Sequence, residues 1–295
     1  MTPAIEAADL GKRYRGRWAL RNTFLSVPTG KVVGVVGANG AGKSTFLHLA
    51  VGLLQPSEGE IRVLGGRPGG SPGQLAKTGF LAQDAPIYGS LTVADHLELG
   101  ARLNPSWDMA AARERIAKVG LDHQQKAAEL SGGQRSQLAL TLAIGKHPEL
   151  LVLDEPVASL DPLARRAFLQ DLMELAADGL TIVLSSHLIS DLERVCDHLI
   201  VLAHGHARRA GDVDDILGEH RLITAPRLPP GQPGGHEVIE RSDTPRQTTL
   251  LVRGDRPVLD PAWTVARVGL EELVLAYMAQ PEPEQTVLGR VRRVA

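Results

Sequence analysis

The segment that most constrains the fold of this chain is Gly37–Ser44, which reads GANGAGKS. It fits the pattern G-x-x-x-x-G-K-[ST], in which glycines let the backbone turn so that several N–H groups point into one concavity. The pattern is informative between a strand and a helix, and here a β-rich run, Lys31–Val36, precedes it and a helical pattern, Lys43–Leu54, follows. We expect Lys43 to reach the β- and γ-phosphates of a nucleotide and Ser44 to offer its hydroxyl to Mg²⁺. The alternative is a plain glycine-rich turn before a helix, which this context disfavours.

Strand-like runs alternate with helical patterns along the first two thirds of the chain. Leu150–Leu153 and Thr181–Ser185 are continuous apolar runs, as parallel strands buried on both faces usually are. Between them Pro162–Asp178 is predicted to be a helix, with Asp161 as N-cap and Gly179 at the C-cap position. Further strands are expected at Gly59–Leu64 and Lys77–Ala82, and a helical region from Thr92 to Lys146. This alternation predicts an α/β fold with a mostly parallel sheet.

The last third of the chain reads differently. Pro226–Gly235 is rich in Pro and Gly and indicates a linker or irregular loop. Strands are expected at Thr248–Arg253 and Thr264–Val268, followed by a short helix with one apolar face formed by Leu270, Leu273, Val274, Tyr277 and Met278. We therefore expect a main domain over 1–219, a small α+β appendix over 220–280 and a flexible tail over 281–295.

Composition narrows the classes of protein. The 295 residues contain 32 Lys and Arg against 34 Asp and Glu, and only 3% are aromatic, so a nucleic-acid partner is not expected. The single Cys196 excludes an intrachain disulfide and a cysteine-rich zinc site. No apolar run reaches the roughly 18 residues of a membrane span, and no signal peptide is visible. These features predict a soluble, cytoplasmic chain.

Two acidic residues, Asp154 and Glu155, directly follow the predicted strand Leu150–Leu153. Open α/β sheets bind ligands at the carboxyl ends of their strands, where these side chains are expected. Asp154 suits a carboxylate that holds Mg²⁺ directly or through one of its ligands, and Glu155 can polarise a water for in-line attack on the γ-phosphate. A solvated acidic turn before Pro156 is the alternative, which the phosphate-binding loop disfavours.

Ser131-Gly132-Gly133-Gln134 begins another predicted helix. Ser131 could serve only as an N-cap, and the glycines only as a turn. A serine and two glycines at a helix N-terminus also make a second anion site, separate from the first.

With the preceding leucine these four residues resemble the signature of ATP-binding cassette (ABC) ATPases, and further motifs of that family follow in the same order. Gly37–Thr45 resembles Walker A and Leu150–Glu155 resembles Walker B. Ala158–Asp161 resembles the D-loop. Tyr14 stands where the family stacks an aromatic ring on adenine, Gln83 resembles the Q-loop glutamine and His187 the switch histidine. The resemblance covers about residues 4–217.

The resemblance implies a P-loop NTPase cassette with a RecA-like core sheet and a helical subdomain at about 84–148. It implies head-to-tail pairing as a homodimer or heterodimer, with ATP held between one subunit's phosphate loop and the other's signature. The residues expected to bind ATP are Tyr14, Gly37, Asn39, Gly40, Ala41, Gly42, Lys43, Ser44, Thr45, Ser131, Gly132, Gly133, Gln134 and Asp161. Ser44, Gln83 and Asp154 would hold Mg²⁺. Glu155, His187 and Gln83 would act in hydrolysis.

Three segments favour one branch of this family. Phe80–Leu97, Ala158–Leu163 and Leu270–Met278 resemble bacterial multidrug and antibiotic export cassettes. We therefore expect an export ATPase that powers a separate transmembrane permease and sits through it on the inner face of the membrane. The alternatives are a soluble ABC ATPase, a regulatory nucleotide-binding module and a small-molecule kinase, the last disfavoured by the signature and His187.

Overall fold

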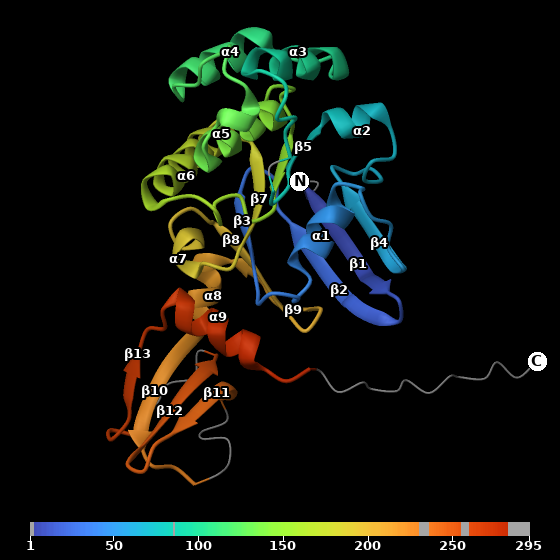
Figure 1. Ribbon diagram of the computed structural model, residues 1–295. Helices are drawn as coiled ribbons and strands as arrows, with labels where there is room; N and C mark the ends of the chain where they lie inside the picture. The colour runs from blue at the N-terminus through green and yellow to red at the C-terminus, as the bar shows by residue number, and fades with distance from the viewer. Residues whose placement is uncertain (1–2, 85, 230–235, 255–259, 283–295) are drawn as a thin grey trace, which may run out of the picture.

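The computed structural model describes residues 3–84, 86–229, 236–254 and 260–282, and Figure 1 shows three sheets and their helices. The central sheet has the order β5-β6-β7-β3-β8-β9. Its strands are β5 (Thr78–Leu81), β6 (Leu150–Leu153), β7 (Thr181–Ser186), β3 (Val32–Val36), β8 (His198–Ala203) and β9 (His206–Asp212). The first five run parallel and β9 is antiparallel to β8. The predicted α/β fold with a mostly parallel sheet is confirmed.

A second, antiparallel sheet contains β2 (Arg17–Val27), β1 (Ile5–Tyr14) and β4 (Glu58–Val63). Strands β1 and β2 are long, with 10 and 11 residues. Buried and exposed side chains alternate along the C-terminal half of β2, so one face packs on the core and the other faces solvent. This sheet and the inner face of the central sheet enclose a core with the helix α1 (Lys43–Ala50).

The predicted helical region from Thr92 to Lys146 is broken into separate helices. They are α3 (Val93–Leu103), α4 (Met109–Lys118), a 3₁₀ turn (Ala127–Glu129) and α5 (Gly132–Ile144). They share a small core of their own and lie together at the top of Figure 1. Another short helix, α2 (Pro72–Ala76), precedes β5.

Helix α6 (Pro162–Ala177) begins and ends where the sequence predicts. The Asp161 carboxylate accepts hydrogen bonds from the backbone N–H groups of Leu163 and Ala164, both at 3.0 Å. Gly179 has φ of 90°, in the left-handed region that favours glycine after a helix. By contrast, α1 ends at Ala50 and not at Leu54. The helix ends two residues before Gly52, whose φ of 80° does not continue a right-handed helix.

The C-terminal part has an antiparallel sheet of order β11-β12-β10-β13, at the bottom of Figure 1. Its strands are β10 (His220–Pro226), β11 (Glu237–Asp243), β12 (Gln247–Arg253) and β13 (Thr264–Ala266). Sequence patterns predict β12 and β13 but not β10 or β11. Residues 230–235 of the expected linker and 283–295 of the expected tail lie outside the described residues.

Helix α9 (Leu270–Ala279) packs back on the cassette and not only on the C-terminal sheet. Leu270, Leu273, Val274 and Tyr277 are buried in the same cluster as residues of α7 (Ile189–Leu192) and β8. The predicted apolar face of this helix is therefore confirmed, and it completes the core on the outer side of the central sheet. Helix α8 (Val213–Glu219) leads from β9 into β10.

Candidate nucleotide site

The phosphate-binding loop connects β3 to α1, as expected. Gly40 and Gly42 have φ of 81° and 108°, which residues with a Cβ rarely adopt. At Gly37 a Cβ would lie 2.4 Å from the Leu202 carbonyl oxygen, and at Gly42 it would lie 2.6 Å from that of Ala19. The loop therefore needs glycine both for its turn and for its close approach to neighbouring backbone. The N-terminus of α1 follows at Lys43, where the helix dipole favours an anion.

A cavity of about 470 Å³ lies over this loop. It is lined by Ala19, Asn39, Gly40, Gly42, Lys43, Ser44, Thr45, Gln83, Glu155 and His187. The fold thus brings Gln83, Glu155 and His187, which are far apart in the chain, to the phosphate loop. These three come from the carboxyl ends of β5, β6 and β7. Ala19, on β2, was not anticipated from the sequence.

Glu155 is the centre of a buried ionic contact. Lys43 Nζ lies 3.3 Å from Glu155 Oε1, and both side chains are less than a tenth exposed. His187 Nδ1 lies 2.6 Å from Glu155 Oε2. Lys43 Nζ also donates to the Gly37 carbonyl oxygen at 2.8 Å. The residue expected to direct water therefore contacts both Lys43 and His187, the two side chains expected to face the γ-phosphate.

The backbone at Glu155 is also unusual. Its φ is 49°, in the left-handed region that a residue with a Cβ enters only when its surroundings hold it there. One restraint is the hydrogen bond from the Glu155 N–H to Ser185 Oγ at 2.8 Å. Ser185 in turn donates to Asp154 Oδ1 at 2.7 Å. The Ser185 hydroxyl therefore helps to fix the position of both acidic residues, through the backbone of Glu155 and the carboxylate of Asp154.

Ser185 was missed as a site residue. The signal was available, because it is a polar residue in the apolar run TIVLSS, and a buried hydroxyl needs a partner. Asp154 itself is 2% exposed and does not line the cavity. His48 Nε2 lies 4.0 Å from its Oδ2, another contact that the sequence did not indicate.

Tyr14 lies near the end of the β1–β2 hairpin, and its side chain is 44% exposed. Lys12 Nζ lies 5.5 Å from the centre of its ring. Tyr14 is absent from the cavity lining, whereas Ala19 of the following strand is present. The structure therefore leaves its ring open to a stacking ligand without bringing it to the phosphate loop.

The signature residues form a second cluster. Ser131 caps α5, since its hydroxyl accepts from the Gln134 N–H at 3.3 Å and Gln134 Oε1 accepts from the Ser131 N–H at 2.9 Å. A Cβ on Gly133 would lie 3.3 Å from the Cβ of Ala164, in the first turn of α6. This cluster and the N-cap Asp161 are therefore neighbours. Neither Asp161 nor any of Ser131, Gly132, Gly133 and Gln134 lines the phosphate-loop cavity.

Comparison with known proteins gives a consistent result. Residues 20–158 match the family model described as ABC transporter. A Nod factor export ATP-binding protein I of Rhizobium johnstonii is 34% identical over 96% of this chain and 86% of its own length. A bacitracin transport ATP-binding protein of Enterococcus faecalis is 30% identical over 76% of this chain and 74% of its own.

Among solved structures, a dimeric ATP-binding cassette in a post-hydrolysis state, bound to ADP and Pi, superposes with a TM-score of 0.64. It is 25% identical to this chain and the match covers 71% of this chain and 98% of that one. Together with the phosphate loop and the residues that the fold gathers around it, these matches show that the chain belongs to the ABC transporter family, as an ATP-binding cassette that hydrolyses ATP.

Proposed function

We propose that this chain is the motor subunit of an exporter of drugs or other small molecules, pairs head to tail with a second cassette and drives a separate membrane permease. The observation that carries the proposal is the cavity that joins the phosphate loop to Gln83, Glu155 and His187. The names of relatives that export Nod factor or transport bacitracin support the export branch.

The residue roles follow from position and chemistry. The loop N–H groups and Lys43 bind the β- and γ-phosphates, as a buried cation beside a helix N-terminus does. Glu155 orients the attacking water and accepts its proton, and His187 contacts the γ-phosphate. Because the phosphates need Lys43, ATP has to compete with Glu155 for this side chain. Tyr14 stacks on adenine with its exposed ring.

Mg²⁺ fits the donor set of this site. Hard cations take oxygen ligands, and the Ser44 hydroxyl, the Gln83 amide and the Asp154 carboxylate provide them. Within the described ranges no group of three or more His, Cys, Asp and Glu side chains could hold a metal alone. We infer that Mg²⁺ is held jointly with the phosphate oxygens, where it neutralises charge on the transferred group.

The division of the site supports dimer formation. Ser131, Gly133, Gln134 and Asp161 cluster away from the phosphate loop, so a second cassette is needed to bring signature and phosphates together. Leu163, two residues after Asp161, is 80% exposed although it is a large apolar residue. We infer that dimerisation buries it.

A groove of about 520 Å³ next to Gln83 is the proposed permease contact. It is lined mainly by apolar residues of β5, α5 and the segment that follows α1, and Leu53 and Leu75 at its edge are 63% and 50% exposed. Since β5 leads directly into Gln83, a helix seated here can sense the nucleotide site. In the part of the chain that the structure describes, no helix is long and apolar enough to span a membrane. The occupant is therefore proposed to be a cytoplasmic helix of the permease, which would hold the cassette at the inner face.

For the domains we propose a cassette over 1–219, including a helical subdomain at about 84–148, and a C-terminal unit over 220–280. The separate core of α3, α4 and α5 supports the subdomain. The C-terminal unit shares a core with the cassette through α9 and is not an independent body in its packing.

The test compares wild type with Glu155→Gln and with the double variant Glu155→Gln, Ser131→Arg. In ATP and Mg²⁺, Glu155→Gln should run as a dimer in size-exclusion chromatography and the double variant as a monomer. Dimers of both would refute the head-to-tail arrangement.

Co-purification with the candidate permease should be lost in Leu75→Glu but retained in the exposed control Met173→Glu. ATPase activity indifferent to every permease would favour a soluble ABC ATPase.

A further inference from the structure

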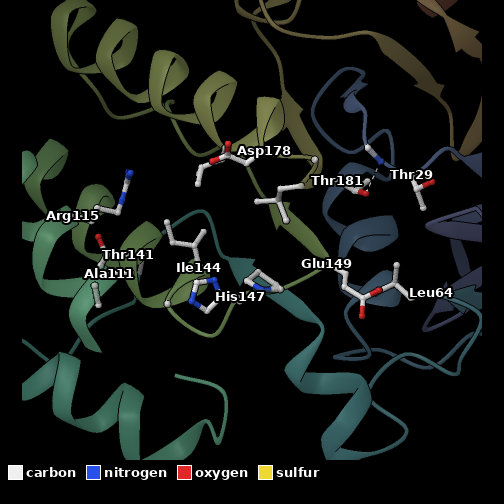
Figure 2. A pocket seen from close by; sticks show the side chains of 17 residues that line it. Thr29, Leu64, Ala111, Arg115, Thr141, Ile144, His147, Glu149, Asp178 and Thr181 are labelled. Atoms are coloured by element: carbon white, nitrogen blue, oxygen red, sulfur yellow. Dashed lines mark hydrogen bonds between the residues drawn. The ribbon is translucent and has the colours of Figure 1, made fainter. Parts of the chain in front are cut away.

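A second cavity, of about 600 Å³, lies at the amino ends of the central strands, opposite the carboxyl ends where the phosphate loop lies. Glu149 and Thr181, which stand where β6 and β7 begin, line it. Figure 2 shows Ala111, Arg115 and Thr141 on one side and Leu64, Glu149 and Thr29 on the other, with Ile144 and His147 between them. None of its lining residues belongs to the nucleotide site or to the proposed permease groove.

The cavity has an apolar floor built from several elements. Leu64, Ile144, Leu175 and Leu180 are half-buried and line it. Its volume lies within the range of about 300–1,000 Å³ in which organic ligands are bound. A molecule that covers these four side chains gains the free energy of removing apolar surface from water.

The polar end of the cavity contains a hydrogen-bond donor that lacks an acceptor. Arg115 Nη2 donates to Gln137 Oε1 at 2.9 Å and to Asp171 Oδ2 at 3.0 Å, so its charge is compensated. Its Nε is buried and has no acceptor among the described residues. Buried donors are nearly always paired, so this N–H favours a ligand oxygen.

The rim selects against anions. Asp178 is exposed at the rim and forms no ion pair with another described residue, and Glu149 contributes a second carboxylate, paired with Lys77 at 2.9 Å. Because Lys77 compensates the charge of Glu149, the repulsion comes from Asp178: a negative group entering beside it would meet like charge, whereas a neutral or cationic group would not.

We propose that this cavity binds an amphipathic organic molecule, neutral or cationic, whose oxygen accepts a hydrogen bond from Arg115, and that its occupancy is coupled to nucleotide binding. The coupling follows from two helices. Helix α5 begins at the N-cap Ser131 and ends at Ile144, and α6 begins after Asp161 and ends beside Asp178. Their C-terminal ends line the cavity, and their N-terminal ends carry the signature and the D-loop.

With 13 and 16 residues, the two helices are rods of about 20 and 24 Å. A ligand between their far ends therefore fixes the angle between them, and with it the position of Ser131 relative to Asp161. A ligand that prefers one angle changes the affinity for ATP, and ATP must change the affinity for that ligand by the same factor.

The probe is Prodan, a neutral naphthalene dye with a carbonyl at one end and a dimethylamino group at the other. The full chain should bind it saturably with a blue shift of its emission. Ala111→Trp, which fills the cavity, should weaken binding at least tenfold, whereas Ala110→Trp, at an exposed position of the same helix outside the lining, should not. Arg115→Lys, which keeps the charge beside Asp171, should weaken it about fivefold.

Circular dichroism shows whether each variant is folded. Absence of saturable binding to wild type, or equal affinity in Ala111→Trp and Ala110→Trp, would overturn the assignment of the site.

For the coupling, the Kd of Prodan is measured in Glu155→Gln with and without ATP and Mg²⁺, and the Kd of ATP with and without Prodan. We expect both to change at least threefold and by the same factor, and unchanged values would refute the coupling. The Prodan titrations of wild type and of the cavity variants use no nucleotide and no permease, so the assignment of the site stands or falls apart from the export proposal.

Discussion

Glu155→Gln provides the sharpest test of the nucleotide site because it should change binding and turnover in opposite directions. In the structure Glu155 holds Lys43 at 3.3 Å and His187 at 2.6 Å. The phosphates of ATP need the same two side chains. Removing the negative charge therefore frees Lys43 and removes a like charge from beside the γ-phosphate, while the amide oxygen of glutamine still accepts a hydrogen bond.

The size of the effect can be bounded from this geometry. At an effective dielectric constant of about 20, two unit charges 3.3 Å apart attract with about 5 kcal/mol. Desolvation of a buried pair cancels most of this energy, so we expect a net gain in ATP binding of about 1.4 kcal/mol, or tenfold. Turnover should fall by about 10²–10⁴, the usual contribution of a positioned general base.

The assays are titration with a fluorescent ATP analogue in the presence of Mg²⁺, and phosphate release at saturating ATP. Glu60→Gln is a matched control, since it removes a carboxylate from an exposed pair with Arg62, where both side chains are more than half exposed. Such pairs contribute little, so neither constant should change. Unchanged or weaker ATP affinity in Glu155→Gln would refute the competition between Glu155 and the phosphates for Lys43.

Three further predictions concern stability and the second cluster. Ser131→Ala removes the cap of α5 and should lower the free energy of unfolding by about 1 kcal/mol. It should reduce ATPase activity but leave the ATP affinity of the monomer unchanged. A loss of monomer affinity would mean that Ser131 binds the ATP of its own subunit and not that of the partner. Leu273→Ala, at a fully buried position in the core shared by α9 and β8, should lose about 2–5 kcal/mol in urea unfolding, and a loss below 1 kcal/mol would show that α9 is dispensable for that core. Burial lowers the pKa of His220, whose ring contacts the Tyr277 hydroxyl, so the unfolded chain binds the proton more readily and stability should fall as pH drops below about 6.5. His220→Gln should reduce that decline between pH 7.5 and 5.5, and an unchanged slope would exclude this histidine as a cause.

The sequence predicts best where local chemistry decides the structure. Helix α6 begins and ends at positions that its sequence predicts, because the cap residue Asp161, the following Pro162 and the left-handed Gly179 act within a few residues. The run Leu150–Leu153 coincides with β6, since a strand buried on both faces has to be apolar throughout.

Prediction fails where distant contacts decide. Strand β9 (HARRAGD) has no apolar pattern, and pairing with β8 makes it a strand. The role of Ser185 depends on β6 and β7 lying side by side, which the sequence predicts only as part of a parallel sheet. The roles of Tyr14, Ser131 and the other proposed ATP contacts stay predictions that a measurement of nucleotide binding would test.

The position of α9 also determines when the cassette can finish folding during synthesis. Leu273, Val274 and Tyr277 cover apolar side chains of β8 and α7. They leave the ribosome about 80 residues later than those two elements. Until those residues emerge, the outer face of the central sheet keeps apolar surface in water, where it can associate with other chains. A nascent cassette therefore has its phosphate loop long before its core is closed, and a chain cut short before Leu270 would contain every nucleotide-binding motif and still expose that face.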